Sequence, residues 1–216
     1  MAAVSAEAVR GNLAAVRERI DRAAMRAGRD GAGVEILVAV KYVGVEDIDT
    51  LADAGVTLVG ENRAQELLEK AQRAPGRLRW HFIGALQSRK VKLIVPHVEL
   101  IHSVATESVL RELGRHAPEG FEILVEVNVS GEEGKAGIAP AQLDDFIARS
   151  PVTVAGLMTM PPLAPDPQRS RQYFARLAAL ARERGLRTLS MGTSQDFEVA
   201  VEEGATIVRI GTTILG

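Results

Sequence analysis

The 216-residue sequence predicts a closed (β/α)8 barrel of the TIM type with one extra helix at its N-terminus. Eight short apolar runs alternate with amphipathic stretches, which is typical of repeated strand-helix units around a parallel sheet. The alternative is an open doubly wound sheet, but no GxGxxG motif follows the first run, so the simplest reason to prefer a dinucleotide-binding sheet is missing. Barrels of this kind typically need about 250 residues, so this one would be compact.

The first 30 residues are expected to form a helix that packs on the barrel, because Val9, Val16 and Ile20 recur at helical spacing. Strands are then expected at Glu35–Lys41, Thr57–Gly60, Arg79–Ile83, Leu100–Ser103, Glu122–Asn128, Val152–Leu157, Thr188–Met191 and Thr206–Ile210. Helices are expected between them at Glu46–Ala54, Arg63–Ala71, Gln87–Val95, Thr106–Gly114, Ala141–Arg149, Pro167–Arg184 and Gln195–Glu203. No linker interrupts this alternation, so residues 1–216 are interpreted as a single domain.

The composition excludes several classes of function. A net charge of −2 gives no global argument for a nucleic-acid or membrane partner. The chain has no cysteine, so disulfides and thiolate metal sites are excluded, and no His/Asp/Glu spacing resembles a metal site. The start lacks the apolar core of a signal peptide, and no later run approaches transmembrane length. A cytoplasmic location is therefore expected.

Lys41 ends the first expected strand, in the stretch VEILVAVKYVG. Side chains alternate along a strand, so Leu37, Ala39 and Lys41 share one face, and Lys41 would point into the mouth of the barrel, where active groups lie. A desolvated lysine has a lowered pKa, and as a free amine it forms a Schiff base with an aldehyde. The structural alternative is a lysine that reaches water and pairs with Glu61.

Glycine and hydroxyl residues follow the last two expected strands, in SMGTS (residues 190–194) and VRIGTT (residues 208–213). Thr193 and Ser194 follow one strand, and Gly211 and Thr212 follow the other. Loops at these two places often hold phosphate in such barrels, because glycine lets the backbone N–H approach and hydroxyls add donors. Ser194 is equally suited to be the N-cap of the helix expected from Gln195.

Arg209 lies within an apolar run, where a guanidinium needs an acceptor. One hypothesis is a structural ion pair with an inward carboxylate such as Glu126. The other is a contact to a bound ligand, either to its phosphate or to a ring nitrogen. Together, a lysine able to form an imine, a phosphate cradle and an inward arginine indicate an aldehyde that carries phosphate.

Two further candidates rest on weaker patterns. His81, in WHFIG, suits a contact to a ligand and equally suits a strand-end histidine satisfied by the protein. Asn62, in GENRAQEL, is either a site residue or a helix N-cap. The polar loop GEEGKAG, residues 131–137, is either a lid or an ordinary mobile loop.

Eight motifs follow one another along the chain: VAVK, GENRAQE, WHFIGALQSRKVK, HSV, VNVSGEEGKAG, GLMTMPP, SMGTSQDFEVA and VRIGTTILG. Together they resemble the pyridoxal phosphate homeostasis proteins, the YggS/PROSC family. The resemblance covers nearly the whole chain, from about Leu37 to Gly216, and the ordered set of motifs is very specific.

This resemblance implies a single barrel, similar to the N-terminal domain of alanine racemase, that holds pyridoxal 5′-phosphate (PLP) in its mouth. Lys41 looks like the internal-aldimine lysine, and Arg209 like the partner of the pyridine nitrogen, which makes the cofactor a weaker electron sink. Ser194, Gly211 and Thr212 look like phosphate contacts. The full set of cofactor-binding residues expected is Lys41, Asn62, His81, Thr193, Ser194, Arg209, Gly211 and Thr212.

The function implied is intracellular PLP (vitamin B6) homeostasis without catalytic turnover. The protein would hold the aldehyde as a lysine Schiff base, keep free PLP low, and pass it on or buffer it. The expected partners are PLP and PLP-dependent apo-enzymes, with no nucleic acid and no membrane, and a monomer is expected.

Two alternatives share parts of this site. A PLP-dependent amino-acid racemase commonly uses a second base, which in alanine racemases is a tyrosine from a C-terminal β-domain. This sequence ends at Gly216, soon after the eighth expected strand, and holds only Tyr42 and Tyr173, so racemase activity is not expected. A phosphosugar enzyme acting through an imine on Lys41 would use the same lysine and phosphate cradle.

Overall fold

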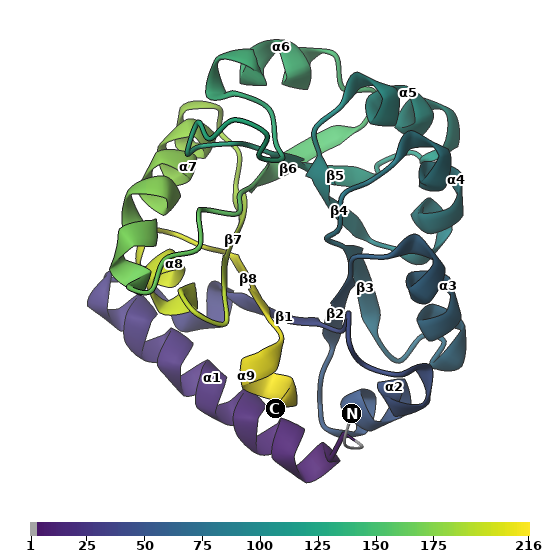
Figure 1. Ribbon diagram of the computed structural model, residues 1–216, viewed down its shortest axis with the longest axis vertical. Coiled ribbons are helices and arrows are strands. Elements are labelled where there is room, and N and C mark those ends of the chain that lie inside the picture. The colour runs from purple at the N-terminus through teal and green to yellow at the C-terminus, as the bar shows by residue number, and fades with distance from the viewer. Residues whose placement is uncertain (1–3) are drawn as a thin grey trace.

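The computed structural model describes residues 4–216 and shows a closed barrel of parallel strands in the order β1 to β8. The last strand pairs with the first, with Leu37 opposite Arg209 and Val38 opposite Ile210, which closes the ring. Seen down the barrel, the helices form an outer layer around the strands (Figure 1). The predicted (β/α)8 fold is therefore confirmed.

The strands are β1 (Glu35–Ala39), β2 (Leu58–Glu61), β3 (Arg79–Phe82), β4 (Leu100–Val104), β5 (Glu122–Glu126), β6 (Thr153–Met158), β7 (Thr188–Thr193) and β8 (Ile207–Ile210). The α-helices are α1 (Ala6–Arg26), α2 (Ile48–Asp53), α3 (Ala64–Arg73), α4 (Val91–Ile94), α5 (Glu107–His116), α6 (Leu143–Ala148), α7 (Arg171–Glu183), α8 (Phe197–Glu202) and α9 (Thr212–Leu215). The short helix α9 was not expected from the sequence.

The first strand ends two residues earlier than the sequence predicts. The backbone N–H of Val40 still donates to Gly60, 3.0 Å away on β2. The carbonyl of Val40 instead accepts from the N–H of Val43 at 3.0 Å, which closes a turn, and from the ammonium of Lys70 at 2.8 Å. The strand ends here because that carbonyl is used by a turn and by a side chain of α3, and Lys41 consequently lies in the turn.

The barrel has two apolar layers, one on each face of the strands. Alternate residues point inward, and they form a cluster made of Leu37, Leu58, Leu100, Leu124, Met158 and Ile207. The other face packs against the helices, and Val38 and Val40 of the first strand belong to that outer core. This is the division of faces that the alternation in the sequence predicts.

Helix α1 packs on the outside of the barrel, beside α8 and α9 (Figure 1). Ser5 is its N-cap and accepts from the N–H of Ala8, and the residues Val9, Val16 and Ile20 are buried. The side chain of Arg17 donates to the carbonyls of Gly31 and Val34 at 3.0 and 2.9 Å, which joins the helix to the start of β1. Residues 1–3, which the expected N-terminal helix segment also includes, lie outside the described residues.

Candidate functional site

A cavity of about 350 Å³ opens at the C-terminal ends of the strands. Seven of the eight residues expected to bind a ligand line it, and they come from the ends of β1, β2, β7 and β8. They are Lys41, Asn62, Thr193, Ser194, Arg209, Gly211 and Thr212. The structure thus brings together residues that are up to 171 positions apart in the sequence, since Lys41 and Thr212 line the same cavity.

Lys41 lies at the rim of this cavity, in the turn after β1, and is exposed. Its Nζ atom lies 4.8 Å from the centre of the Tyr42 ring. It makes no ion pair with Glu61, the partner that the structural alternative gave it, because Glu61 pairs with the buried Lys70. The amine of Lys41 is therefore accessible to a ligand.

The loops after β7 and β8 are joined by a hydrogen bond at the cavity wall. The N–H of Gly211 donates to the hydroxyl of Ser194 at 3.2 Å. Ser194 is not a helix N-cap, because α8 begins at Phe197 and its N-cap position is Asp196. The carboxylate of Asp196 instead accepts from the N–H and the hydroxyl of Thr193, at 2.8 and 3.1 Å. The hydroxyl of Ser194 therefore still has its proton to donate into the cavity, whereas the N–H of Gly211 donates to Ser194 and the donors of Thr193 are used by Asp196.

Arg209 is buried, and its guanidinium is fixed by acceptors on β7 and in the segment that follows β6. One terminal nitrogen donates to the carbonyl oxygen of Ser190 at 2.8 Å and to its hydroxyl. The other donates to the carbonyl of Thr159 and to the sulfur of Met160, both at 2.9 Å. A thioether is a weak acceptor, so the donor facing Met160 is the one a ligand would take most easily. Burial lowers the pKa of Arg209 to about 10, and the charge of Glu126 opposes that fall.

Glu126 lines the cavity but does not form the direct ion pair with Arg209 that was one of the hypotheses. No carboxylate lies within ion-pairing distance of Arg209 among residues 4–216, and Arg209 uses carbonyl and hydroxyl acceptors instead. Burial raises the pKa of the Glu126 carboxyl, and the positive charge of Arg209 partly offsets this rise. From the sequence, Glu126 is expected only as a partner for Arg209, but the structure shows that Glu126 also lines the cavity.

Asn62 supplies an unsatisfied polar atom at this site. Its Oδ1 atom is buried and has no hydrogen-bond partner within residues 4–216. Asn62 is not a helix N-cap either, because α3 begins at Ala64 with Arg63 at the N-cap position. Buried polar atoms are nearly always paired, so an unpaired one at a cavity wall indicates a place for a ligand atom.

His81 lies apart from the residues that line the cavity. It is buried inside the barrel, and its Nδ1 atom lies 2.9 Å from Nε2 of His102. Burial, together with the charge of Arg79, lowers the pKa of His81 to about 3, so the imidazole is neutral. A histidine satisfied by the protein is what the structure shows. Met160 and Ala136 line the cavity in its place, and Ala136 comes from the loop of residues 131–137.

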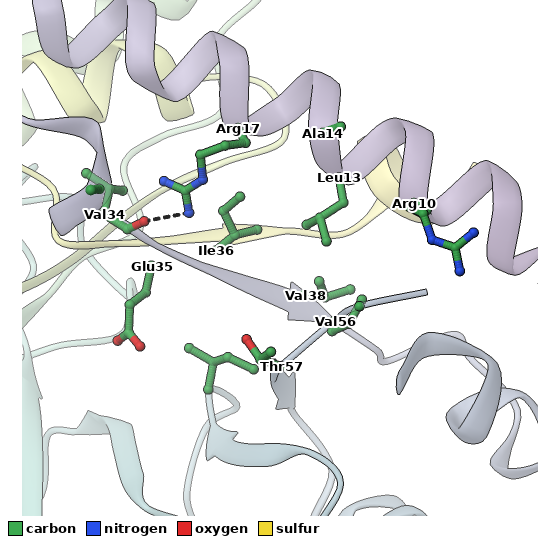
Figure 2. A pocket seen from close by; sticks show the side chains of 13 residues that line it. Arg10, Leu13, Ala14, Arg17, Val34, Glu35, Ile36, Val38, Val56 and Thr57 are labelled. Carbon is green, nitrogen blue, oxygen red and sulfur yellow. Dashed lines mark hydrogen bonds between the residues drawn. The ribbon is translucent and has the colours of Figure 1, made fainter. Parts of the chain in front are cut away.

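A second cavity, of about 460 Å³, lies between α1 and the starts of β1 and β2 (Figure 2). Its charged groups are already paired within the protein. Arg17 donates to the Gly31 and Val34 carbonyls, Arg10 donates to the carbonyl of Asp53, and the carboxylate of Glu35 pairs with Arg79. Leu13, Ile36 and Val38 line the space between them. With these charged groups paired, we interpret this cavity as a packing gap at the base of the barrel.

Over the described part of the chain, no three His, Asp or Glu side chains gather in a way that could hold a metal ion. Nor does any described helix combine the length and the apolar character needed to cross a membrane.

Comparisons with known proteins give the family directly, although no family model matches the chain. The pyridoxal phosphate homeostasis protein of Aquifex aeolicus is 43% identical over 218 residues, covering 94% of this chain and 96% of the relative. The protein of the same name from Pseudomonas aeruginosa is 41% identical over 217 residues, covering 95% and 94%. The structure of PipY from Synechococcus elongatus with PLP bound is 28% identical, with a TM-score of 0.79 over 96% of this chain and 100% of that one. The chain therefore belongs to the family of pyridoxal phosphate homeostasis proteins.

Proposed function

We propose that this protein binds pyridoxal 5′-phosphate in the cavity at the mouth of the barrel and takes part in PLP homeostasis in the cytoplasm without catalytic turnover. Lys41 would hold the cofactor as a Schiff base. The observation that carries the proposal is that Lys41, the Ser194–Gly211 pair and the unsatisfied Oδ1 of Asn62 line one cavity. The family of the chain supports the same ligand.

The residues present fit the cofactor. When bound, PLP supplies an aldehyde that reacts reversibly with an amine, a phosphate group and a pyridine ring. The cavity volume of about 350 Å³ is in the range of small-molecule sites. Lys41 is its one amine among the described residues, and the Arg209 donor that now faces Met160 is available to a ring nitrogen. The fit is therefore chemical as well as geometric.

Each side chain would have a distinct task. The hydroxyl of Ser194 and the residue Thr212 would bind the phosphate, whose charge suits backbone and hydroxyl donors. The backbone N–H of Gly211, which donates to Ser194 in this structure, would turn to the phosphate as well. Asn62 would orient the ring through its free Oδ1 atom, with the ligand as donor. Arg209 would hold its proton while facing the ring nitrogen, so that nitrogen stays an acceptor. The exposed position of Lys41 lets water and other amines reach the bond, as release of the cofactor requires.

The absence of turnover is part of the proposal. Among the described residues that line the cavity there is no tyrosine, and Lys41 is the only lysine. Tyr173, on α7, packs against the outer core. A racemase commonly uses a second base on the opposite face of its substrate. Among the described residues of the cavity wall, the only titratable acid is Glu126.

The test is a PLP titration of dialysed protein, followed by borohydride reduction and peptide mapping. We expect a saturable visible absorption band, one reduced adduct per chain, and that adduct on Lys41. The matched control is Lys135→Ala, which removes a half-buried amine paired with Glu132 and should change neither result. Lys41→Ala should abolish the band and leave only weaker, phosphate-dependent binding.

Two outcomes would overturn the proposal. A lack of saturation, or adducts spread over Lys90, Lys92 and Lys135, would return Lys41 to a structural role and favour the phosphosugar enzyme. Racemisation or decarboxylation of amino acids by the PLP-loaded protein, lost in Lys41→Ala, would refute the absence of turnover.

A further inference from the structure

Lys70 is a buried charged residue that the proposed ligand site does not use. It lies on α3, is 1% exposed, and is among the largest fully buried side chains of the protein. Burying an ammonium costs much free energy unless acceptors surround it. Lys70 has three of them: the carboxylate of Glu61, the carboxylate of Glu66 at 3.0 Å and the carbonyl of Val40 at 2.8 Å.

The carbonyl of Val40 is the group at which β1 stops. Its other donor is the N–H of Val43, which closes the turn that contains Lys41. The ammonium of Lys70 therefore holds the peptide group that directly precedes Lys41. A displacement of that peptide group would move the point from which the Lys41 side chain enters the cavity.

Glu61, the partner of Lys70, fixes the next loop in the same way. Its second carboxylate oxygen accepts from the backbone N–H of Asn62 at 2.6 Å and of Arg63 at 3.1 Å. Asn62 lines the cavity and has the free Oδ1 atom. A single buried ion pair thus connects the loop that carries Lys41 to the loop that carries Asn62.

Stability alone is a weak explanation for this arrangement. Buried ion pairs are often no more stabilising than apolar residues of similar size, because both charges lose their water. Val40 also needs no lysine to satisfy its carbonyl, since Val43 already donates to it. What the lysine adds is a fixed position for the chain on both sides of the cavity.

We propose that Lys70 is a positioning residue for Lys41: its ammonium, held by Glu61, fixes the Val40 carbonyl and so sets where the Lys41 amine meets an aldehyde. This inference rests on the proposed function. It predicts that Lys70 affects bond formation at Lys41 and leaves the phosphate-binding end of the cavity, made by β7 and β8, unaffected.

The experiment compares two ligands that differ in the group that meets Lys41. PLP carries the aldehyde, and pyridoxine 5′-phosphate carries an alcohol there and forms no bond with an amine. In Lys70→Met, we expect the affinity for PLP to fall by about tenfold or more, as a displaced reacting group implies, with little change for pyridoxine 5′-phosphate. Melting temperatures of the ligand-free proteins are recorded beside both titrations.

Two more variants keep the test decisive. Lys70→Met leaves Glu61 unpaired in the interior, so the double variant Glu61→Gln with Lys70→Met removes both charges and decides the question if the single variant does not fold. Glu66→Gln is the matched control, because it removes one partner of Lys70 but keeps the contacts with Glu61 and Val40. We expect the double variant to lose affinity for PLP selectively and the control to behave as the wild type.

An equal loss of affinity for both ligands would show that Lys70 is merely structural and would overturn the inference. So would a lower melting temperature with an unchanged ratio of the affinities for PLP and pyridoxine 5′-phosphate. A wild-type protein that forms no adduct on Lys41 is a different result, because it refutes the proposed function itself.

Discussion

The imidazoles of His81 and His102 are hydrogen-bonded to each other inside the barrel, with Nδ1 of His81 2.9 Å from Nε2 of His102. The other nitrogen of His102, Nδ1, lies 2.8 Å from the hydroxyl of Ser190, which also accepts from Arg209. A buried chain of four side chains thus runs from β3 to the arginine at the cavity wall. Arg209 can only donate, so the arrangement that pairs a donor with an acceptor in each of these contacts has Ser190 donating to His102 and His102 donating to His81.

The two buried histidines predict that the free energy of unfolding decreases as the pH falls below about 6.5. Burial, with the charge of Arg79, lowers the pKa of His81 to about 3, and burial, with the charges of His81 and Arg209, holds the pKa of His102 well below its usual range. The unfolded chain therefore binds more protons than the folded one between these pKa values and about 6.5. Each histidine then contributes a loss of about 1.4 kcal/mol per pH unit as the pH falls through this range.

The measurement is the free energy of unfolding by urea at pH 7, 6 and 5. In His81→Gln, the free energy of unfolding should change less steeply with pH, by about the contribution of one histidine, because one of the two neutral imidazoles is gone. His116→Gln, at an exposed position, is the surface control, because it leaves both buried histidines in place. NMR signals from the His81 imidazole that titrate near pH 6.5 in the folded protein would contradict the prediction.

Arg209→Met should reduce stability and yet leave the reaction at Lys41 possible. The substitution keeps an unbranched side chain, shorter than that of arginine, but removes the donors to Ser190 and to the carbonyl of Thr159, and unpaired buried acceptors cost about 1–3 kcal/mol each. Lys41 lies in the turn after β1, the other strand beside β8, and has no hydrogen bond with Arg209 within residues 4–216. We expect borohydride to trap PLP on Lys41, with a shifted absorption maximum and weaker binding.

The comparison for that prediction is Arg209→Lys, which keeps a positive charge but has fewer donors. It should fall between the wild type and Arg209→Met in stability and in absorption maximum. An absorption maximum equal to that of the wild type in both variants would show that Arg209 does not face the ring.

Much of this fold could be predicted because its signals are local. Alternating apolar runs such as Glu35–Ala39 and helical spacing such as Val9, Val16 and Ile20 reflect which face of each element is buried. The residue at which β1 ends could not be predicted from local signals. The carbonyl of Val40 is taken by Lys70, 30 residues later in the chain, and nothing in VEILVAVKYVG records that contact.

The site residues also divide into those that local sequence signals predict and those that depend on three-dimensional contacts. Lys41, Ser194 and Gly211 follow strands, and the strand-end rule for barrels places them at one mouth. His81 is also near a strand end, but its neighbour His102 on β4 offers a partner within the barrel, and only the three-dimensional pairing decides between the protein and a ligand. The buried lysine of this protein is Lys70 and not Lys41, because burial depends on the residues that α3 packs against.

Two glycines at the ends of β7 and β8 give the last prediction, because they separate ligand binding from folding. A Cβ atom at Gly211 would lie 3.5 Å from the carbonyl oxygen of Ala39, an ordinary contact. At Gly192, where φ is +90°, it would lie 2.5 Å from Cβ of Ala200 and 2.9 Å from Cα of Phe197. Gly211→Ala should therefore keep its melting temperature, whereas Gly192→Ala should lose about 1–3 kcal/mol of stability from overpacking.

Ligand binding should show the reverse pattern, with weaker binding in Gly211→Ala and nearly unchanged binding in Gly192→Ala. A methyl group at Gly211 stands beside the N–H that would meet the phosphate, and losing one such charged hydrogen bond weakens binding by roughly tenfold. We expect that loss for pyridoxine 5′-phosphate as well as for PLP, since both carry the phosphate and only PLP reacts with Lys41. Folded Gly192→Ala should bind both ligands nearly as the wild type does. If Gly211→Ala bound pyridoxine 5′-phosphate at full affinity, the phosphate would have to be held elsewhere in the cavity, and the Ser194–Gly211 hydrogen bond would be a structural link between two loops.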